Sequence, residues 1–482
     1  MKEITGEEFI KLLKSNINTI ENYSIIDEIT INPLQVSSFN KVSKCYFKGS
    51  LKLMGNIKQK EPENLKNLII SDSIIEKSIV INRCSFELLK LEMIVCNDSI
   101  FSISECNLGD LDVNYLDVKS KQFSITHNTF KYKFKLNNVT ALNASFILRH
   151  NTFNPKEKTF FRSCMIHDCT ILNCDISNND FGSDLRFTNN KLGLEDKYSN
   201  NSFKNCVFNS ASFYETDFGY STTFKECRFE ESVLFEKLKN EITTKLEFTE
   251  CLFKSSASFK KSRLNCITFK NCIFQSSSFF ENSFFNLINI NNSVFEKTAF
   301  FDDIQIKKIY DCNRKTIRII KFNLQKSENK IDYNKFRIYE FEAYKKDLIH
   351  YIKEYRKDQK LSHYRKREIK TFKRDLLILN ITGLFSVYGT DWKRALKCTI
   401  IFGLFFYSLL YFIEFYVLLN LQGNSNFWIG AFRFFLLTDF YSPFLERQFL
   451  NNGFSWLILV LGKIIIAFGI YEMIQAFRKF KA

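Results

Sequence analysis

The sequence is poor in proline and glycine, with 4 prolines and 15 glycines among 482 residues. It also lacks an apolar stretch near its start, because Met1 to Leu13 reads MKEITGEEFIKLL, which is charged and amphipathic. We therefore expect no secretory signal peptide. Without export, the 14 cysteines are expected to be reduced, packed thiols in a cytosolic compartment and not a disulfide framework.

Spacings that carry chemistry are missing as well. Cys164, Cys169 and Cys174 are five residues apart, whereas metal sites use ligands at short spacings such as C-x₂-C. Acidic pairs with a basic partner do not recur along the chain, as a polysaccharide-cleaving site would require. The sequence thus predicts no catalytic, cofactor-binding or metal site, and we expect a protein that is not an enzyme.

Excess charge is absent from most of the chain. The net charge is +16, and residues 305–397 alone hold 25 Lys or Arg against 11 Asp or Glu. The remainder is therefore close to neutral. A basic segment of this size is typical of contact with a polyanion, either anionic lipid headgroups or nucleic acid.

What the sequence does contain is 54 phenylalanines and an internal repeat in which they recur. A small residue, any residue and a large apolar residue follow one another at ten places, from Cys84–Phe86 to Ser293–Phe295. The large residues are 21 to 24 apart, except for one step of 32 between Ile176 and Phe208. That step contains a polar insert at 194–201, which we interpret as a loop. Residues two apart on an extended chain share a face, so both members of each pair should point inward.

A second spacing of five residues runs inside the period and predicts further inward positions, for example Leu264, Phe269, Phe274, Phe279 and Phe284. Helices would instead place apolar residues three and four apart. Four such pentads and one or two corner residues make a coil that stacks on its neighbours. We expect a parallel β-helix over 81–305, preceded by a cap and irregular first coils over 1–80.

The inward large and small pairs of residues 80–305 resemble those of the pentapeptide-repeat family. The resemblance implies an all-β, right-handed parallel β-helix, here with about 21–24 residues per coil instead of the family's strict 20. Pairs such as Phe101 and Ile103 in the first half are closer to a generic parallel β-helix. Square and three-sided cross-sections therefore both stay open. Some members of the family mimic DNA through an acidic surface, which the near-neutral charge here disfavours.

Residues 306–397 are expected to form a basic helical connector, because apolar side chains recur at helical spacing from Tyr333 onward. The connector lies directly before an apolar segment, which favours anionic lipid headgroups over nucleic acid as its partner. The residues predicted to contact anionic lipid are Arg356, Lys357, Lys360, Arg365, Lys366, Arg367, Lys370, Lys373 and Arg374.

Residues 398–482 are expected to form an α-helical membrane domain. Two segments, about 398–421 and 454–477, approach the roughly 20 apolar residues that a bilayer requires. Between them, about 427–437 is too short to span and is expected to be an interfacial or re-entrant helix. Lysines and arginines lie just before the first of the two long segments and just after the second. We therefore expect a multi-pass protein of the inner membrane with both termini cytoplasmic.

Two ionisable residues lie inside the expected spans. Glu414 and Lys463 fall at similar depth, and charges inside a membrane usually face the interior of the helix bundle. We therefore predict that Glu414 and Lys463 form an intramembrane ion pair.

The C-terminal part also resembles the membrane tail of bacterial membrane-anchored pentapeptide-repeat proteins, through Ser386–Leu396 and Tyr471–Phe480. Some relatives resemble two-helix ion channels. Here the stretch LLTDFYSPF lacks the glycine-containing carbonyl filter of potassium channels, which disfavours a selective cation pore.

Two hypotheses for function remain. The first is a non-enzymatic scaffold or sensor whose β-helix binds an unidentified cytoplasmic protein. The second is a homo-oligomeric membrane effector or ion-channel-like pore, gated by the β-helix.

Overall fold

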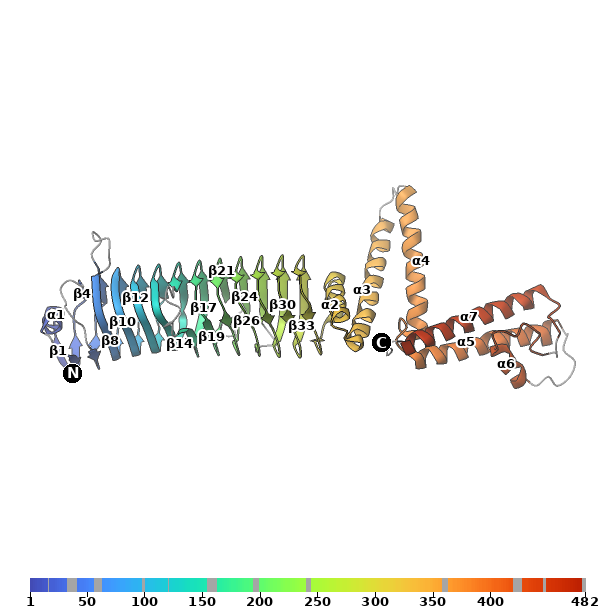
Figure 1. Cartoon of the computed structure of the whole chain (residues 1–482), viewed down its shortest axis with the longest axis horizontal. Coiled ribbons are helices and arrows are strands. Elements are labelled where there is room, and N and C mark those ends of the chain that lie inside the picture. Colours follow the sequence, from blue (N-terminus) through green and yellow to red (C-terminus); the bar gives the residue numbers. More distant parts are fainter. Residues whose placement is uncertain are drawn as a thin grey trace. The chain divides into compact units, whose positions relative to one another are not determined.

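The structure is a computed structural model of the chain. It describes residues 1–15, 17–32, 41–55, 63–97, 100–119, 121–153, 163–193, 199–239, 244–357, 363–418, 427–444 and 448–478. The chain divides into two compact units, Met1–Ser327 and Glu328–Ala482. The first unit is built of β-strands closed by helices at its ends, and the second is helical (Figure 1).

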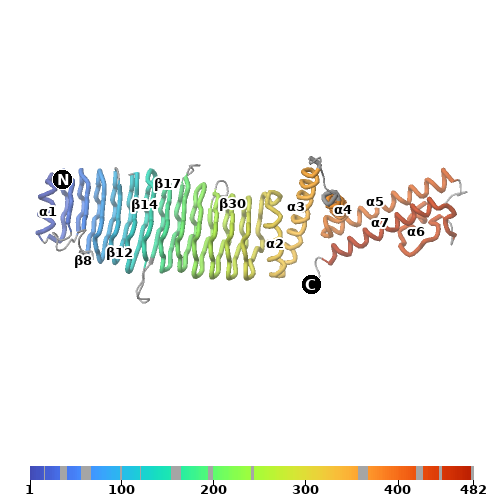
Figure 2. Tube along the Cα trace, turned by 90° about the horizontal axis from the view of Figure 1, so that it is seen from above, coloured from blue at the N-terminus to red at the C-terminus, as the bar shows by residue number. Residues whose placement is uncertain are grey.

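The first unit is a parallel β-solenoid of about 12 turns. Its strands run from β1 (Lys2–Ile4) to β36 (Gln305–Ile306), and each pairs in parallel with strands of the neighbouring turns. Figure 2 shows the turns as a row of stacked coils. The expected stack of parallel β-coils is thereby confirmed, and it begins within the first residues of the chain.

Strand length changes along the solenoid. The first turns contain strands of two to four residues, the turns after them contain long strands, and the later turns contain many strands of two residues. The long ones are β8 (Glu63–Ile75), β10 (Cys84–Cys96), β12 (Asn107–Val118) and β14 (Thr129–Arg149); short ones include β25 (Arg228–Phe229), β28 (Leu252–Phe253) and β31 (Ile273–Phe274). The difference that the sequence showed between the two halves thus corresponds to a difference in strand length.

Phenylalanine fills the core of the later turns because its ring stacks on the same ring one turn away. Along one column, neighbouring rings from Phe153 to Phe295 lie 4.4–5.1 Å apart and within 11° of parallel. Two further columns begin at Phe203 and Phe213, and rings of different columns meet edge to face. Both arrangements are favourable for aromatic rings. The abundance of phenylalanine is therefore a repeated core position.

One predicted rung of this ladder is wrong. Ile176 does not follow Phe153; Phe153 pairs with Phe181, and Phe181 pairs with Phe208. Ile176 belongs to another column, between Leu148 and Phe203. The long step of 32 thus disappears. Most of the insert predicted at 194–201 lies outside the described residues, but Asn200 begins the strand β21 (Asn200–Lys204).

The spacing of five also fails after Phe274. Phe280 and Phe285 are fully buried, whereas Phe279 and Phe284, which the spacing placed inside, are only partly buried. Phe279 lies on the outer surface and stacks on Phe300 of the next turn. Side chains alternate along a strand, so one additional corner residue moves the next phenylalanine to the other face.

Many corners of the solenoid are occupied by non-glycine residues in the left-handed backbone region. In one column this conformation is found in every turn from Arg83 (φ 55°) to Asn292 (φ 51°), and a second column runs from Asn22 to Asp303. Asparagine tolerates this region well, but glutamate, lysine and methionine do so less readily. The corners hence carry local strain wherever the residue is not asparagine or aspartate.

Two opposite substitutions test the strain at these corners. Glu226 and Asn271 are both exposed, with φ values of 55° and 54°. Glu226→Asn is expected to raise the free energy of unfolding by about 0.5–1 kcal/mol. Asn271→Val is expected to lower it by about 1–3 kcal/mol, because a β-branched residue is disfavoured there. Urea unfolding of the detergent-solubilised protein measures both, and changes of the same sign would contradict the assignment.

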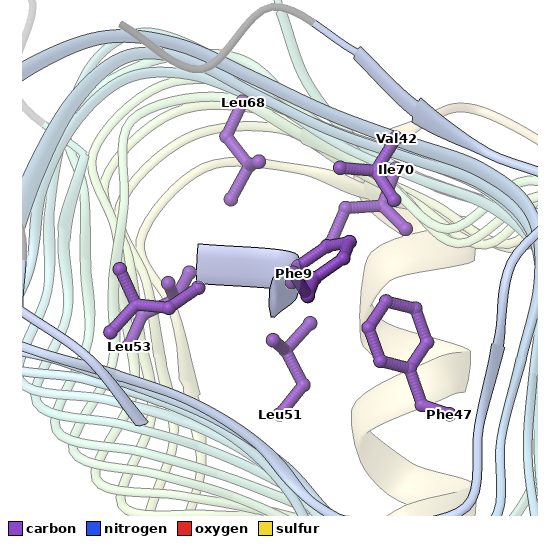
Figure 3. Close-up of a pocket in the computed structure, with 8 residues that line it drawn as sticks. Phe9, Val42, Phe47, Leu51, Leu53, Leu68 and Ile70 are labelled. Carbon is purple, nitrogen blue, oxygen red and sulfur yellow. The ribbon is translucent and has the colours of Figure 1, made fainter. Parts of the chain in front are cut away.

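Helices cover both ends of the solenoid. At the start, α1 (Gly6–Lys14) is closed by a capping box between Thr5 and Glu8, and it inserts Phe9 into the end of the core. Figure 3 shows Phe9 among inward side chains of the first turns; the ring of Phe47 lies 5.6 Å away. The small gap between them is apolar on all sides, so it is a packing defect under the cap and offers no polar group to a ligand.

At the other end, α2 (Arg314–Lys326) satisfies backbone groups of the last turn. Thr316 Oγ1 accepts a hydrogen bond from the N–H of Ile290 at 2.8 Å, and Asn323 Oδ1 accepts one from Ala299 at 3.0 Å. Ile317, between them, is buried. This cap removes an open edge at which another strand could pair.

The second unit begins with an antiparallel pair, α3 (Lys330–Lys357) and α4 (His363–Ser386). Two long helices follow, α5 (Trp392–Phe412), which continues as the π-helical turn η3 (Ile413–Val417), and α7 (Gly453–Arg478). The short helix α6 (Phe427–Phe435) lies between them in sequence and packs on both. Helices are thus confirmed near 398–421, 427–437 and 454–477, and two of them are long and apolar enough to span a membrane.

Candidate functional site

Most of the cysteines lie inside the solenoid, whereas Cys398 belongs to α5. All fourteen are free thiols, and all but Cys266 and Cys398 are buried. Cys84 and Cys106 stack as expected, with the N–H of Cys84 3.5 Å from Sγ of Cys106. Burial raises the pKa of the Cys164 thiol, and that of Cys169 to about 12, so both are poor nucleophiles. Among the described residues, no group of three or more His, Cys, Asp or Glu could hold a metal.

In the column that contains Cys84 and Cys106, three buried asparagines take the place of a thiol. Asn128, Asn151 and Asn179 point inward, and each uses its amide to hold the neighbouring turns together. Oδ1 of Asn151 accepts the N–H of Asn128 at 3.0 Å, while Nδ2 of Asn151 donates to the carbonyl of Ile125 at 2.8 Å. The amides replace main-chain partners that the corners lack, so we assign them a structural role.

His127 and His150 stack on the outside of the solenoid, with ring centroids 4.7 Å apart. Both histidines occupy left-handed corners and are exposed. The residues that follow them, Asn128 and Asn151, point inward and are buried. The histidines and asparagines therefore do not form one polar patch. His167 contacts Thr188 and Asp168 in a separate place.

The residues predicted to bind anionic lipid belong to the ends of two helices. Arg356 and Lys357 end α3, Arg365 and Lys366 lie in the first turn of α4, and Lys360 is outside the described residues. The remaining four follow on α4 with exposed side chains: Arg367, Lys370, Lys373 and Arg374. The structure thus places the described part of the predicted basic set on one helical hairpin.

The turn between α4 and α5 is tightly constrained. Val387, Tyr388 and Gly389 all have positive φ, at 51°, 58° and 77°. A left-handed valine or tyrosine is rare and costs on the order of 1–3 kcal/mol, so surrounding contacts must enforce it. The positive φ favours glycine at 389, and a Cβ there would lie 2.7 Å from Oε1 of Gln475, so that side chain would have to shift.

Those contacts come from α3 and α7. The hydroxyl of Tyr388 donates to Oε1 of Glu342 on α3 at 2.6 Å. The buried hydroxyl of Ser386 donates to the buried carboxylate of Glu472 on α7 and accepts the N–H of Gly389 at 2.7 Å. We define Ser386–Gly389, Glu342 and Glu472 as the junction, because they tie the connector helices to the two apolar helices.

Small residues bring α5 close to both α7 and α6. A Cβ on Gly469 of α7 would lie 1.9 Å from Oγ1 of Thr399 on α5, and a Cβ on Gly403 of α5 would lie 2.5 Å from the ring of Phe435 on α6. Close approach at small residues is typical of helix pairs in membranes. The same packing seats α6, since Tyr407 donates a hydrogen bond to the carbonyl of Phe427 at 2.6 Å.

The two ionisable residues predicted to pair are both buried. Glu414 lies in the π-helical turn η3. Lys463, on α7, donates to the carbonyl of Leu436 and lies 3.4 Å from that of Arg433, at the C-terminal end of α6. A lysine there complements the negative end of the helix dipole. The ion pair of Glu414 with Lys463 stays a prediction.

No family model, curated protein or solved structure matches this chain. The fold alone therefore defines the class: a parallel β-solenoid with a helical C-terminal tail, two of whose helices could cross a membrane.

Proposed function

We propose that this chain is a membrane-anchored, non-enzymatic scaffold or sensor of the pentapeptide-repeat kind. Its right-handed solenoid presents a protein-binding surface in the cytoplasm, and its tail is a multi-pass anchor in the inner membrane. The observation that carries the proposal is the exposure of apolar side chains on the long helices. Only 22% of the most apolar window of α5 and 39% of that of α7 is buried. A soluble core helix would be mostly covered, so lipid is the natural partner of these faces.

A solenoid of this kind suits binding better than catalysis. Its inward positions are filled with stacked rings, aliphatic side chains and buried thiols, and its outer surface is long and regular. Repeat surfaces of this type bind partners over an extended area. The proposed partner is a cytoplasmic protein, which a pull-down from native membranes would identify.

Membrane orientation tests the proposal directly. A reporter that is active only in the cytosol is expected to work when fused after Ala482 and to fail when inserted at Asn424, between the two long helices. The physical reason is the excess of Lys and Arg at the N-terminal end of α5 and at the C-terminal end of α7. Activity of the reporter at Asn424 would contradict both the orientation and the cytoplasmic location of the thiols.

A second function, an oligomeric membrane effector or ion-channel-like pore, is favoured by one feature. A short helix, α6, packs between two long apolar helices, and the buried Glu414 lies in a π-helical turn, a geometry common at functional sites. Ion flux in liposomes and the oligomeric state of the purified protein distinguish this function from a scaffold. A monomeric protein that conducts no ions would exclude the pore and support the scaffold.

A further inference from the structure

Helix α4 has an apolar face that no described part of the chain covers. Leu377, Ile378, Ile381 and Leu384 are 40–60% exposed. They are spaced at one, three and three residues, so they form one stripe on the last turns of the helix. An exposed stripe of four large aliphatic side chains is unfavourable in water, and such patches mark interaction sites.

The opposite face of α4 packs on α3. Tyr344 donates to Oδ2 of Asp375 at 2.9 Å, the ring of Phe372 lies 6.0 Å from that of Tyr351, and Leu379 is buried against α3. The apolar stripe therefore points away from α3. Figures 1 and 2 both show α3 on one side of α4 and the helices α5 and α7 extending from the other side.

The end of α4 is fixed at the level where α5 becomes apolar. The ring of Phe385 lies 5.4 Å from Phe402 on α5 and 5.1 Å from Phe468 on α7. Nε of Arg394 donates to the carbonyl of Leu384 at 2.9 Å. The stripe thus ends beside the first turns of α5, and further along that helix apolar side chains such as Ile401 are exposed as well.

The same face of α4 becomes basic one turn earlier. Lys370, Lys373 and Arg374 are exposed and precede the apolar stripe at helical spacing. The axis of α4 runs across the axes of α5 and α7 (Figure 1). If α5 and α7 cross a membrane, α4 therefore lies parallel to the membrane surface. Apolar and basic residues on one face of such a helix match an anionic lipid surface.

We propose that α4 is an interfacial helix that lies on an anionic bilayer. Leu377, Ile378, Ile381 and Leu384 enter the boundary between headgroups and acyl chains, while Lys370, Lys373 and Arg374 bind anionic headgroups. The proposal rests on the proposed membrane anchoring and adds to it a lipid-binding surface outside the long helices. A consequence is that lipid composition acts directly on the junction, since α4 ends in Ser386.

Site-specific photo-crosslinking tests this surface in the full-length protein. The photoreactive residue p-benzoylphenylalanine replaces Ile378, or Ile401 on α5, or Lys353, an exposed residue of α3. Each variant is reconstituted in vesicles of phosphatidylcholine, or of phosphatidylcholine and phosphatidylglycerol in equal parts. We expect lipid adducts at 401 in both vesicles, at 378 mainly in the anionic vesicles, and none at 353.

The outcomes separate this inference from the anchoring on which it rests. Adducts at 401 without adducts at 378 would overturn the interfacial helix and leave the anchor intact. Absence of adducts at 401 would overturn the anchor and the interfacial helix together. A protein–protein adduct at 378 would show that a second copy covers the stripe, and it would also overturn the proposal.

Charge removal tests the choice of anionic lipid. In the variant with the photoreactive residue at 378, Lys370→Gln, Lys373→Gln and Arg374→Gln together are expected to lower the adduct yield in anionic vesicles by about fivefold or more. The matched control removes three exposed lysines of the solenoid, through Lys297→Gln, Lys307→Gln and Lys308→Gln, and is expected to leave the yield unchanged. Equal yields for the two triple variants would overturn the headgroup contact.

Discussion

Replacement of Phe253 by alanine is expected to lower the free energy of unfolding of the solenoid by about 3–5 kcal/mol. The ring of Phe253 is fully buried and stacks on Phe229 at 4.7 Å and on Phe274 at 4.4 Å. Removing it leaves a cavity between two rings that the backbone pairing of the turns holds in place. Phe274→Ala is expected to cost a similar amount for the same reason.

The matched control lies one residue further along the chain. Lys254 points outward, and its ammonium bonds to Glu230 at 2.6 Å in an exposed ion pair. Lys254→Ala is expected to change the free energy of unfolding by at most about 0.5 kcal/mol. Urea unfolding of the detergent-solubilised protein, monitored through resistance to protease, measures the free energy of unfolding of all three variants. Equal tolerance of the three would refute the column of rings.

The second large effect is expected in the helical tail. Gly469→Ala places a methyl group 1.9 Å from Oγ1 of Thr399, so α7 must move away from α5. Overpacking of this kind costs about 1–3 kcal/mol. We expect a lower melting temperature and a smaller yield of monodisperse protein in detergent. Gly453→Ala is the control, because no atom lies within 4 Å of its new methyl group.

A compensating change shows whether the contact itself is responsible. Thr399→Gly removes the three atoms nearest to the new methyl group of Gly469→Ala. Glycine weakens α5 by about 1 kcal/mol, so the double variant will not equal the natural protein. However, the double variant is expected to lose less unfolding free energy than the two single variants lose together. Additive losses would mean that the two residues do not contact each other.

The register of the solenoid shows where reasoning from the sequence succeeded and where it failed. Phe208, Phe229, Phe253 and Phe274 were placed in one column correctly, since their neighbours in sequence repeat at an almost constant distance. Phe181 was missed because the insert was sought at 194–201. The constant spacing of 23 was continued from Phe153 to Ile176, whereas the structure pairs Phe153 with Phe181.

The corners could not be assigned from residue type. Asparagine and aspartate favour a left-handed backbone, and Asn178, Asn205 and Asn271 fit that preference. Met93, Tyr115 and Lys237 adopt the same conformation without it. Hydrogen bonds between neighbouring turns enforce the corner at each level, so the identity of the outward residue is only weakly constrained.

The junction was visible in the sequence only as two separate motifs. Ser386–Leu396 and Tyr471–Phe480 stood out through their resemblance to a membrane tail, but nothing in either motif pointed to the other. The hydrogen bond between Ser386 and Glu472 joins residues 86 apart. Likewise, the carbonyls that Lys463 meets at the end of α6 became apparent only once α6 had been placed.

The sequence by itself determined that the N-terminal part is a stack of parallel β-coils and that the tail contains two long apolar helices. Both follow from local periodicity, because side chains alternate along a strand and a bilayer-length helix requires an unbroken apolar run. Tertiary structure alone decided which phenylalanine meets which, where Lys463 donates, and that α4 keeps one apolar face uncovered. These depend on the number of residues between contacts and on packing between distant segments, which no local pattern specifies.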